Sequence, residues 1–245
     1  MMHKHRNLTI VFVSPRSYWD VMKNNLLDTR MRGVRYYQDT HYSLSTLATA
    51  LGELEKRTWS TPTPAFVRSN FGLYGPGTII AMMLGTVCIG AVYFIGPSVF
   101  ERSIHIWSLF VDTRYRRMGL ASQLLKIVVR ATRSIADTIT YQTRLASGSM
   151  PLYLQMGPSL LLNCHVDDTN GDWTNPKVVL EVKTPKSWRI STAQSMKSLP
   201  KDCFAIGVED PFWKQVHTDS SMQRKYEIIG FTRENSTNKV LLRSL

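Results

Sequence analysis

The stretch Val111–Leu125, VDTRYRRMGLASQLL, joins an apolar segment to an apolar-periodic one through an arginine-rich turn that contains Gly119. The preceding residues, Ile104–Val111, are few and apolar, which predicts a buried strand. Beyond the turn, apolar residues recur at helical spacing at Leu120, Leu124, Leu125, Val128 and Val129. A helix is therefore predicted to begin near Gly119. Because the first N–H groups of a helix lack intrahelical partners and share the positive end of its dipole, this turn is predicted to bind an anion such as a pyrophosphate.

Three arginines, Arg114, Arg116 and Arg117, place positive charge around the predicted helix start. Cations are unfavourable at the N-terminus of a helix unless an anion binds there. The alternative interpretation is a surface helix with a basic first turn.

The turn resembles the cofactor signature of the GNAT superfamily of acyl-CoA-dependent N-acyltransferases, which is Arg or Gln, two residues, Gly, any residue, then Gly or Ala. Arg116, Gly119 and Ala121 fill this pattern, and the resemblance extends over residues 78–157. It implies an α/β (α+β) fold with a mixed, mostly antiparallel central sheet flanked by helices. It also implies an enzyme that uses acetyl-CoA or another acyl-CoA and acylates an amine of a protein, a small molecule or a nucleobase by direct attack.

The same resemblance implies the cofactor-binding residues. The backbone of the strand would hold the thioester and pantetheine arm at Leu109, Phe110 and Val111. The amides of the turn would hold the pyrophosphate, at Arg116, Arg117, Met118, Gly119, Leu120, Ala121 and Ser122.

The sequence offers four candidates for the general acid and the general base. His105 is the first choice for the general base, because strict alternation along the strand would place it on the face of Val111 and its ordinary pKa suits proton transfer near neutrality. A structural histidine is the alternative, and Glu101 is the substitute base. For the general acid there are two candidates. Tyr153 in PLYLQMG lies at the family's distance from the cofactor helix, whereas Tyr226 in RKYEIIGF has the local sequence closer to that of the family, since Gly-Phe follows it.

The uncharged stretch Thr78–Phe100 is long enough to span a bilayer. A strand pair is favoured over a membrane helix, because Gly85-Thr86 lies midway as a turn and Val, Ile, Tyr and Phe dominate the second half. The GNAT resemblance also implies a central hairpin here.

Other elements are predicted from periodicity and capping residues. They are a strand at Leu8–Val13, a helix after Ser14-Pro15, a helix at Ser43–Arg57, a strand at Thr138–Thr143, a helix at Ser147–Gly157, and strands at Leu160–Leu162, Val178–Val182 and Lys239–Leu242. We divide the chain into a GNAT-like core, residues 1–157, and a C-terminal extension or insertion that completes the fold, residues 158–245. The GNAT resemblance implies that the region before the helix at Ser43–Arg57 forms a wall of the acceptor cleft. Its aromatic residues could stack on a base or fill a core; they are Tyr36, Tyr37, His41 and Tyr42.

Composition sets the remaining expectations. The 245 residues carry 30 Lys and Arg against 18 Asp and Glu, a formal charge of +12, which attracts phosphate-bearing partners and leaves nucleic acid open as an acceptor. The alternative function is therefore a catalytically silent GNAT-like module that binds nucleic acid or protein. The three cysteines suggest neither a disulfide framework nor a paired metal site, and a reducing cytoplasm is expected. No metal is expected, because neighbouring Cys164 and His165 would point to opposite faces of an extended segment.

Overall fold

The computed structural model describes residues 8–14, 34–36, 43–58, 77–97, 102–166, 173–185, 202–234 and 237–245. The chain divides into two compact units, Met1–Ala136 and Asp137–Leu245. The boundary expected after residue 157 therefore falls inside the second unit. The helix expected after Ser14-Pro15 lies outside the described residues.

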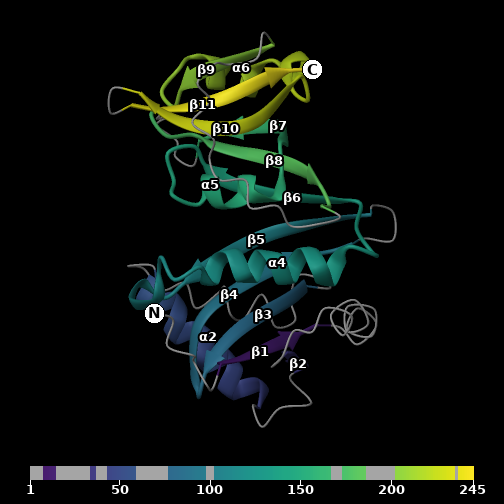
Figure 1. The fold of residues 1–245 in the computed structure, drawn as a ribbon, viewed down its shortest axis with the longest axis vertical. Coiled ribbons are helices and arrows are strands. Elements are labelled where there is room, and N and C mark those ends of the chain that lie inside the picture. Colours follow the sequence, from purple (N-terminus) through teal and green to yellow (C-terminus); the bar gives the residue numbers. More distant parts are fainter. Residues whose placement is uncertain are drawn as a thin grey trace. The chain divides into compact units, whose positions relative to one another are not determined.

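The first unit is a five-stranded sheet with helices packed on it (Figure 1). Its described elements are β1 (Leu8–Val13), β2 (Val34–Tyr36), α2 (Leu44–Thr58), β3 (Gly77–Leu84), β4 (Val87–Ile95), β5 (Ser103–Val111), the 3₁₀ turn η2 (Thr113–Tyr115) and α4 (Leu120–Thr132). The strand order is β2-β1-β3-β4-β5, in which β1 and β2 are parallel and the other neighbours are antiparallel. The predicted strand at 8–13 and the predicted helix at 43–57 are confirmed.

The uncharged stretch after residue 77 forms the hairpin β3–β4. Its two strands are joined at Gly85-Thr86, where Gly85 has a φ of 58°, in the region that favours glycine. The strand pair is thus confirmed against the membrane helix. None of the helices in the described part of the chain combines the length and apolar character needed to cross a membrane.

The helices α2 and α4, which lie in the described part of this unit, cover opposite faces of the sheet. Leu47, Leu51 and Leu54 of α2 pack into one buried cluster with residues of β3 and β4 that point to that face, among them Ile79 and Tyr93. On the other face, a side chain at Gly90 would meet methyl groups of Leu124 in α4 and Val111 in β5, each at 3.4 Å. In Figure 1, α4 accordingly lies in front of the strands and α2 behind them. Burial of each such leucine contributes roughly 1.5–3 kcal/mol.

The second unit is a six-stranded antiparallel sheet with short helices. Its described elements are β6 (Thr138–Arg144), α5 (Met150–Tyr153), the 3₁₀ turn η3 (Leu154–Met156), β7 (Ser159–His165), β8 (Lys177–Lys183), β9 (Cys203–Gly207), α6 (Phe212–Thr218), the 3₁₀ turn η4 (Ser220–Met222), β10 (Tyr226–Glu234) and β11 (Thr237–Ser244). The strand order is β6-β8-β7-β10-β11-β9, and all neighbouring strands are antiparallel.

Strand β8 lies between β6 and β7 and pairs with β6 over the whole of Thr138–Arg144. Residues after 157 therefore belong to the same sheet as β6. Strands β10, β11 and β9 continue it beyond β7. The helix expected at 147–157 is shorter than predicted, since α5 covers four residues and passes into the 3₁₀ turn η3, which Gly157 ends at a φ of 135°.

Candidate active site

The turn that the sequence predicts to bind an anion leads into a helix at the expected residue. After η2 the chain passes through Arg117, at a φ of 63°, to Gly119, at a φ of 80°, and α4 begins at Leu120 with Gly119 as its N-cap. The first helical hydrogen bond runs from Gln123 N–H to Gly119 O at 3.0 Å. The N–H groups of the turn and the first residues of α4 therefore precede the intrahelical ladder. A Cβ built on Gly119 would meet no atom within 4 Å, so the space beside this backbone is open.

The three arginines of the turn have different roles. The Arg114 guanidinium pairs with Asp112, and Arg116 Nε donates to the carbonyl of Val111 at 3.3 Å. Arg117 is exposed and makes no hydrogen bond or ion pair with the described part of the chain. All three arginines were expected to place charge around the anion. Two of them, Arg114 and Arg116, instead bond Asp112 and Val111 at the end of β5.

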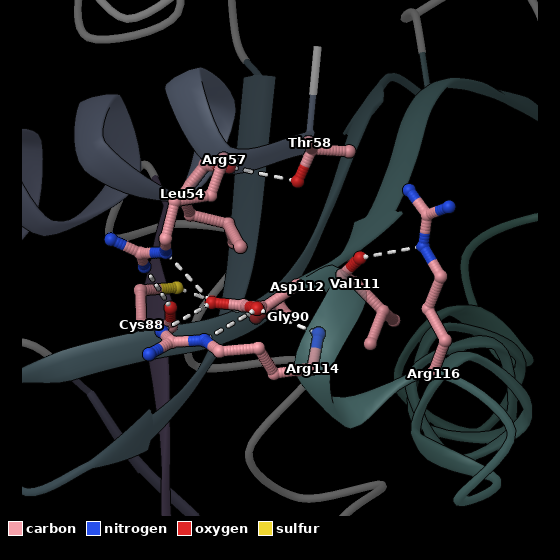
Figure 2. Close-up of polar contacts among 9 residues, drawn as sticks. All are labelled: Leu54, Arg57, Thr58, Cys88, Gly90, Val111, Asp112, Arg114 and Arg116. Carbon is pink, nitrogen blue, oxygen red and sulfur yellow. Dashed lines mark hydrogen bonds and ion pairs between the residues drawn. The ribbon is translucent and has the colours of Figure 1, made fainter.

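Asp112 is the centre of a charged cluster that fastens the turn to the sheet (Figure 2). Its carboxylate accepts from Arg57 Nε at 2.7 Å, from Arg114 Nη2 at 2.8 Å, and from the Arg114 backbone N–H at 3.0 Å. Arg57 also donates from Nη2 to the Cys88 carbonyl at 3.1 Å. Figure 2 shows Arg57 reaching Asp112 from α2, with Arg116 turned away toward Val111.

Burial makes this cluster electrostatically strong. The Asp112 side chain is fully buried, and hydrogen bonds from Arg114, together with the one from Arg57, hold its pKa far below the ordinary value. Two guanidinium groups against one carboxylate leave a net positive charge beside the turn. Burial also raises the pKa of the neighbouring Cys88 thiol to about 12, so this cysteine is protonated and serves as a core residue.

His105 lies on β5, but not on the face that strict alternation predicts. Tyr93 of β4 pairs with Ser108 while the next residue, Phe94, pairs with Ile106, so Trp107 is an extra residue that forms a β-bulge. The extra residue reverses the faces, because side chains alternate with a period of two. His105 therefore pairs with Ile95 and lies on the α2 face, opposite to Val111, and the prediction of a shared face was wrong.

The surroundings of His105 still suit a neutral imidazole. Partial burial lowers the pKa of His105 below its ordinary value. Its ring lies 5.8 Å from that of Trp107 in an edge-to-face arrangement. Trp107 itself is 61% exposed, which is unusual for so large an apolar side chain. The substitute base, Glu101, lies outside the described residues, as do Tyr37, His41 and Tyr42.

The two tyrosine candidates occupy different parts of the second unit. Tyr153 lies at the end of α5, buried and stacked on Tyr141 at a ring distance of 4.4 Å, and burial raises its pKa above the ordinary range. Its hydroxyl makes no hydrogen bond to another described residue. Tyr226 instead begins β10 and packs edge-to-face on Phe204 and Phe212, at 5.9 and 5.1 Å. The segment RKYEIIGF therefore enters a strand at Tyr226 and is not the end of a helix.

Comparison with known families decides the identity of the first part of the chain. Residues 45–157 match the model of the acetyltransferase (GNAT) family. Residues 45–157 of this chain are a GNAT acetyltransferase domain. Within the matched residues, Arg116, Gly119 and Ala121 form the turn described above, and the GNAT domain is that of an acyl-CoA-dependent N-acyltransferase.

Solved structures of acetyltransferases resemble the chain at low identity. The ribosomal-protein-S18-alanine N-acetyltransferase from Escherichia coli is 16% identical, with a TM-score of 0.47 over 60% of this chain and 93% of that one. The aminoglycoside 6'-N-acetyltransferase from Enterococcus faecium is 14% identical, with a TM-score of 0.47 over 59% and 94%. A search of curated proteins found no match.

The turn fits the acyl-CoA that this family uses. A pyrophosphate needs convergent N–H donors, positive potential and backbone that it can approach closely. The turn offers all three, through the start of α4, the exposed Arg117 and the left-handed Gly119 with open space beside it. The expected pyrophosphate residues, from Arg116 to Ser122, thus lie together on one turn.

Two residues of this site escaped sequence reasoning. Asp112 directly follows the strand and caps η2, a position where Asp commonly accepts the N–H two residues on. That local signal was available. Arg57, by contrast, is distant in sequence and looks like an ordinary basic residue in the last turn of a helix. Only the packing of α2 against the sheet reveals that it reaches Asp112.

Among the described residues, no group of three or more His, Cys, Asp or Glu side chains is arranged to hold a metal ion. Cys164 is buried, while the ring of its neighbour His165 contacts the Gln142 amide at 2.8 Å, so the two do not converge.

Proposed function

We propose that this GNAT enzyme transfers an acetyl group from acetyl-CoA directly to a primary amine, with the turn Arg116–Ser122 binding the pyrophosphate. The observation that carries the proposal is the left-handed Gly119 at the start of α4, inside the family match. The backbone of Leu109, Phe110 and Val111, the last residues of β5, would hold the pantetheine arm.

The chemistry required of the protein is limited to orientation and proton transfer. The amine must lose a proton when it attacks the thioester, and the leaving thiolate must gain one. We propose His105 as the base, because partial burial favours its neutral form. We propose Tyr153 as the acid, because it ends the helix that follows β6 and its hydroxyl has no other partner among the described residues.

A pH profile tests the role of His105. Because burial lowers the pKa of His105, the acidic limb of the kcat/KM profile is expected to lie below the pH range in which an ordinary histidine titrates. We expect His105→Gln to lower the plateau by roughly 10²-fold and to remove the acidic limb of the profile.

The control for this experiment is stability. A lowered pKa in the folded state means that stability is present above the unfolded pKa and is lost as pH falls through the window below it. A wild-type acidic limb that follows unfolding would therefore show a loss of circular dichroism signal at the same pH. An unchanged pH profile in His105→Gln contradicts the assignment, and water or Glu101 then becomes the proposed base.

For the acceptor we propose a nucleic acid or another polyanion, on the basis of the formal charge of +12. Acylation of a base requires that it leave its stack, so single-stranded DNA is expected to react faster than duplex. Raising the salt concentration should weaken DNA binding steeply while leaving the KM of a small amine nearly constant. Equal salt dependence of the two acceptors would reject this preference and favour a protein or small-molecule amine.

The first experiment is thermal unfolding with and without acetyl-CoA. A ligand that binds only the folded state at 100 times its Kd raises stability by about 2.7 kcal/mol. We expect a clear rise in Tm at millimolar acetyl-CoA, followed by turnover on an amine. Binding without turnover on any acceptor would favour the alternative, a silent GNAT-like module.

We further propose the cytoplasm as the compartment, since Cys88, Cys164 and Cys203 are free thiols.

A further inference from the structure

The cluster around Asp112 joins three separate pieces of the first unit. Arg57 comes from the end of α2, the Cys88 carbonyl comes from β4, and Asp112 with Arg114 begins the connection from β5 to the anion-binding turn. Figure 2 shows the guanidinium groups of Arg57 and Arg114 meeting at the Asp112 carboxylate, with a second bond from Arg57 to the Cys88 carbonyl. The cluster lies before the turn in sequence and supplies none of the proposed pyrophosphate ligands.

Within the cluster, Arg57 is the long-range link. Asp112 Oδ1 accepts the backbone N–H and Nε of Arg114, at 3.0 and 3.1 Å, and Oδ2 accepts Arg114 Nη2 at 2.8 Å. These bonds join residues two apart and can only shape the turn locally. The bond from Arg57 Nε to Oδ2, at 2.7 Å, is the one side-chain contact of Asp112 in the described residues that reaches another element.

The fully buried side chain of Asp112 makes this link hard to replace. A buried carboxylate that loses a charged partner keeps its desolvation cost, so the backbone that carries it shifts or admits water. A small displacement is enough to matter, because binding groups must be held within about 0.5 Å of their productive positions. Arg57 also bonds the Cys88 carbonyl, so its guanidinium fixes the turn against β4 as well as against α2.

We propose that Arg57 is a positioning residue for the acyl-CoA site, which fixes the anion-binding turn to helix α2 and strand β4 through Asp112. The inference rests on the proposed function, since it concerns the same pyrophosphate site. Arg57 acts through Asp112 and does not contact the ligand. Its loss should weaken acetyl-CoA binding while leaving the proton-transfer groups in place.

The test compares Arg57→Gln with Arg57→Lys in the full chain. We expect Arg57→Gln to raise the Kd and the KM for acetyl-CoA roughly tenfold, with kcat at saturating acetyl-CoA within about twofold of wild type. Arg57→Lys keeps the charge but has one nitrogen for two acceptors, so a rise of about threefold is expected. Kd is measured by calorimetry well below the Tm of each variant, so that only folded protein is compared.

Lys56→Gln is the matched control, because Lys56 is the preceding residue of α2 and pairs at the surface with Glu53 at 2.8 Å. It should leave Kd, KM and kcat unchanged. A lower Tm for Arg57→Gln with an unchanged Kd would show a purely structural role and overturn the inference. Should Arg57→Gln fail to fold, Arg57→Lys decides, and a Kd equal to wild type overturns it. Failure of the wild type to bind acetyl-CoA would instead overturn the proposed function itself.

Discussion

Replacing Gly119 with glutamate should abolish acetyl-CoA binding. The new carboxylate would stand at the start of α4, where the pyrophosphate is proposed to bind, and two negative charges about 4 Å apart near a protein surface repel by about 4 kcal/mol. We expect the Kd to rise by roughly 100-fold or more, since each 1.4 kcal/mol is a factor of ten. The rise in Tm with millimolar acetyl-CoA should disappear, and turnover should disappear with it.

Two variants separate charge from backbone strain in this experiment. Gly119→Ala keeps the site neutral but places a side chain at a φ of 80°, which costs about 1 kcal/mol. Gly85→Glu adds the same charge at a φ of 58° in the β3–β4 turn, which contributes none of the proposed ligands. We expect Gly119→Ala to lower Tm modestly and retain binding, and Gly85→Glu to retain both binding and turnover. Normal binding by Gly119→Glu would place the cofactor elsewhere.

Replacing Tyr153 with phenylalanine should have the second large effect. If its hydroxyl protonates the leaving thiolate, Tyr153→Phe should lower kcat by roughly 10²-fold to 10⁴-fold with little change in the KM for acetyl-CoA. The free energy of unfolding should change by less than about 1 kcal/mol, because the hydroxyl bonds no other described residue and the ring keeps its stacking on Tyr141.

Tyr226→Phe and Tyr141→Phe are the matched controls. Tyr226 packs against Phe204 and Phe212, a contact that phenylalanine preserves, so kcat should stay at the wild-type value. Tyr141→Phe removes a buried hydrogen bond to the Ser159 hydroxyl at 2.7 Å and should cost roughly 1 kcal/mol of stability without a loss of kcat. A loss of kcat in Tyr226→Phe but not in Tyr153→Phe would exchange the two assignments.

Local sequence signals were sufficient for most of the fold. The glycine-arginine turn, the start of α4 near Gly119 and the hairpin around Gly85-Thr86 each follow from neighbouring residues, and each is found in the structure. The family match, over residues 45–157, includes this turn. Such features depend on periodicity and on the conformational freedom of single glycines, which a sequence displays directly.

Features that depend on pairing between distant segments were not predictable. The face of His105 is set by one unpaired residue on β5, which only the register with β4 reveals. The partner of Asp112 is an arginine on another element. The order of β6, β8 and β7 likewise could not be predicted, because it is defined only by the pairing of the strands. A segment such as RKYEIIGF is compatible with the end of a helix and with a strand until its neighbours are known.

The bulge at Trp107 lets β5 carry one residue more than its partner strand without disturbing the rest of its pairing. Deleting this residue would leave every other pair with β4 unchanged, since its two neighbours already pair with consecutive residues of β4. Pairing it with β4 would instead turn every preceding side chain of the strand over. Ile104 and Ile106, both buried, would then exchange faces with Ser103 and His105, so two large apolar groups would leave the α4 face and two polar ones would enter it. The centre of the sheet therefore depends on Trp107 remaining unpaired, and not on the length of the strand.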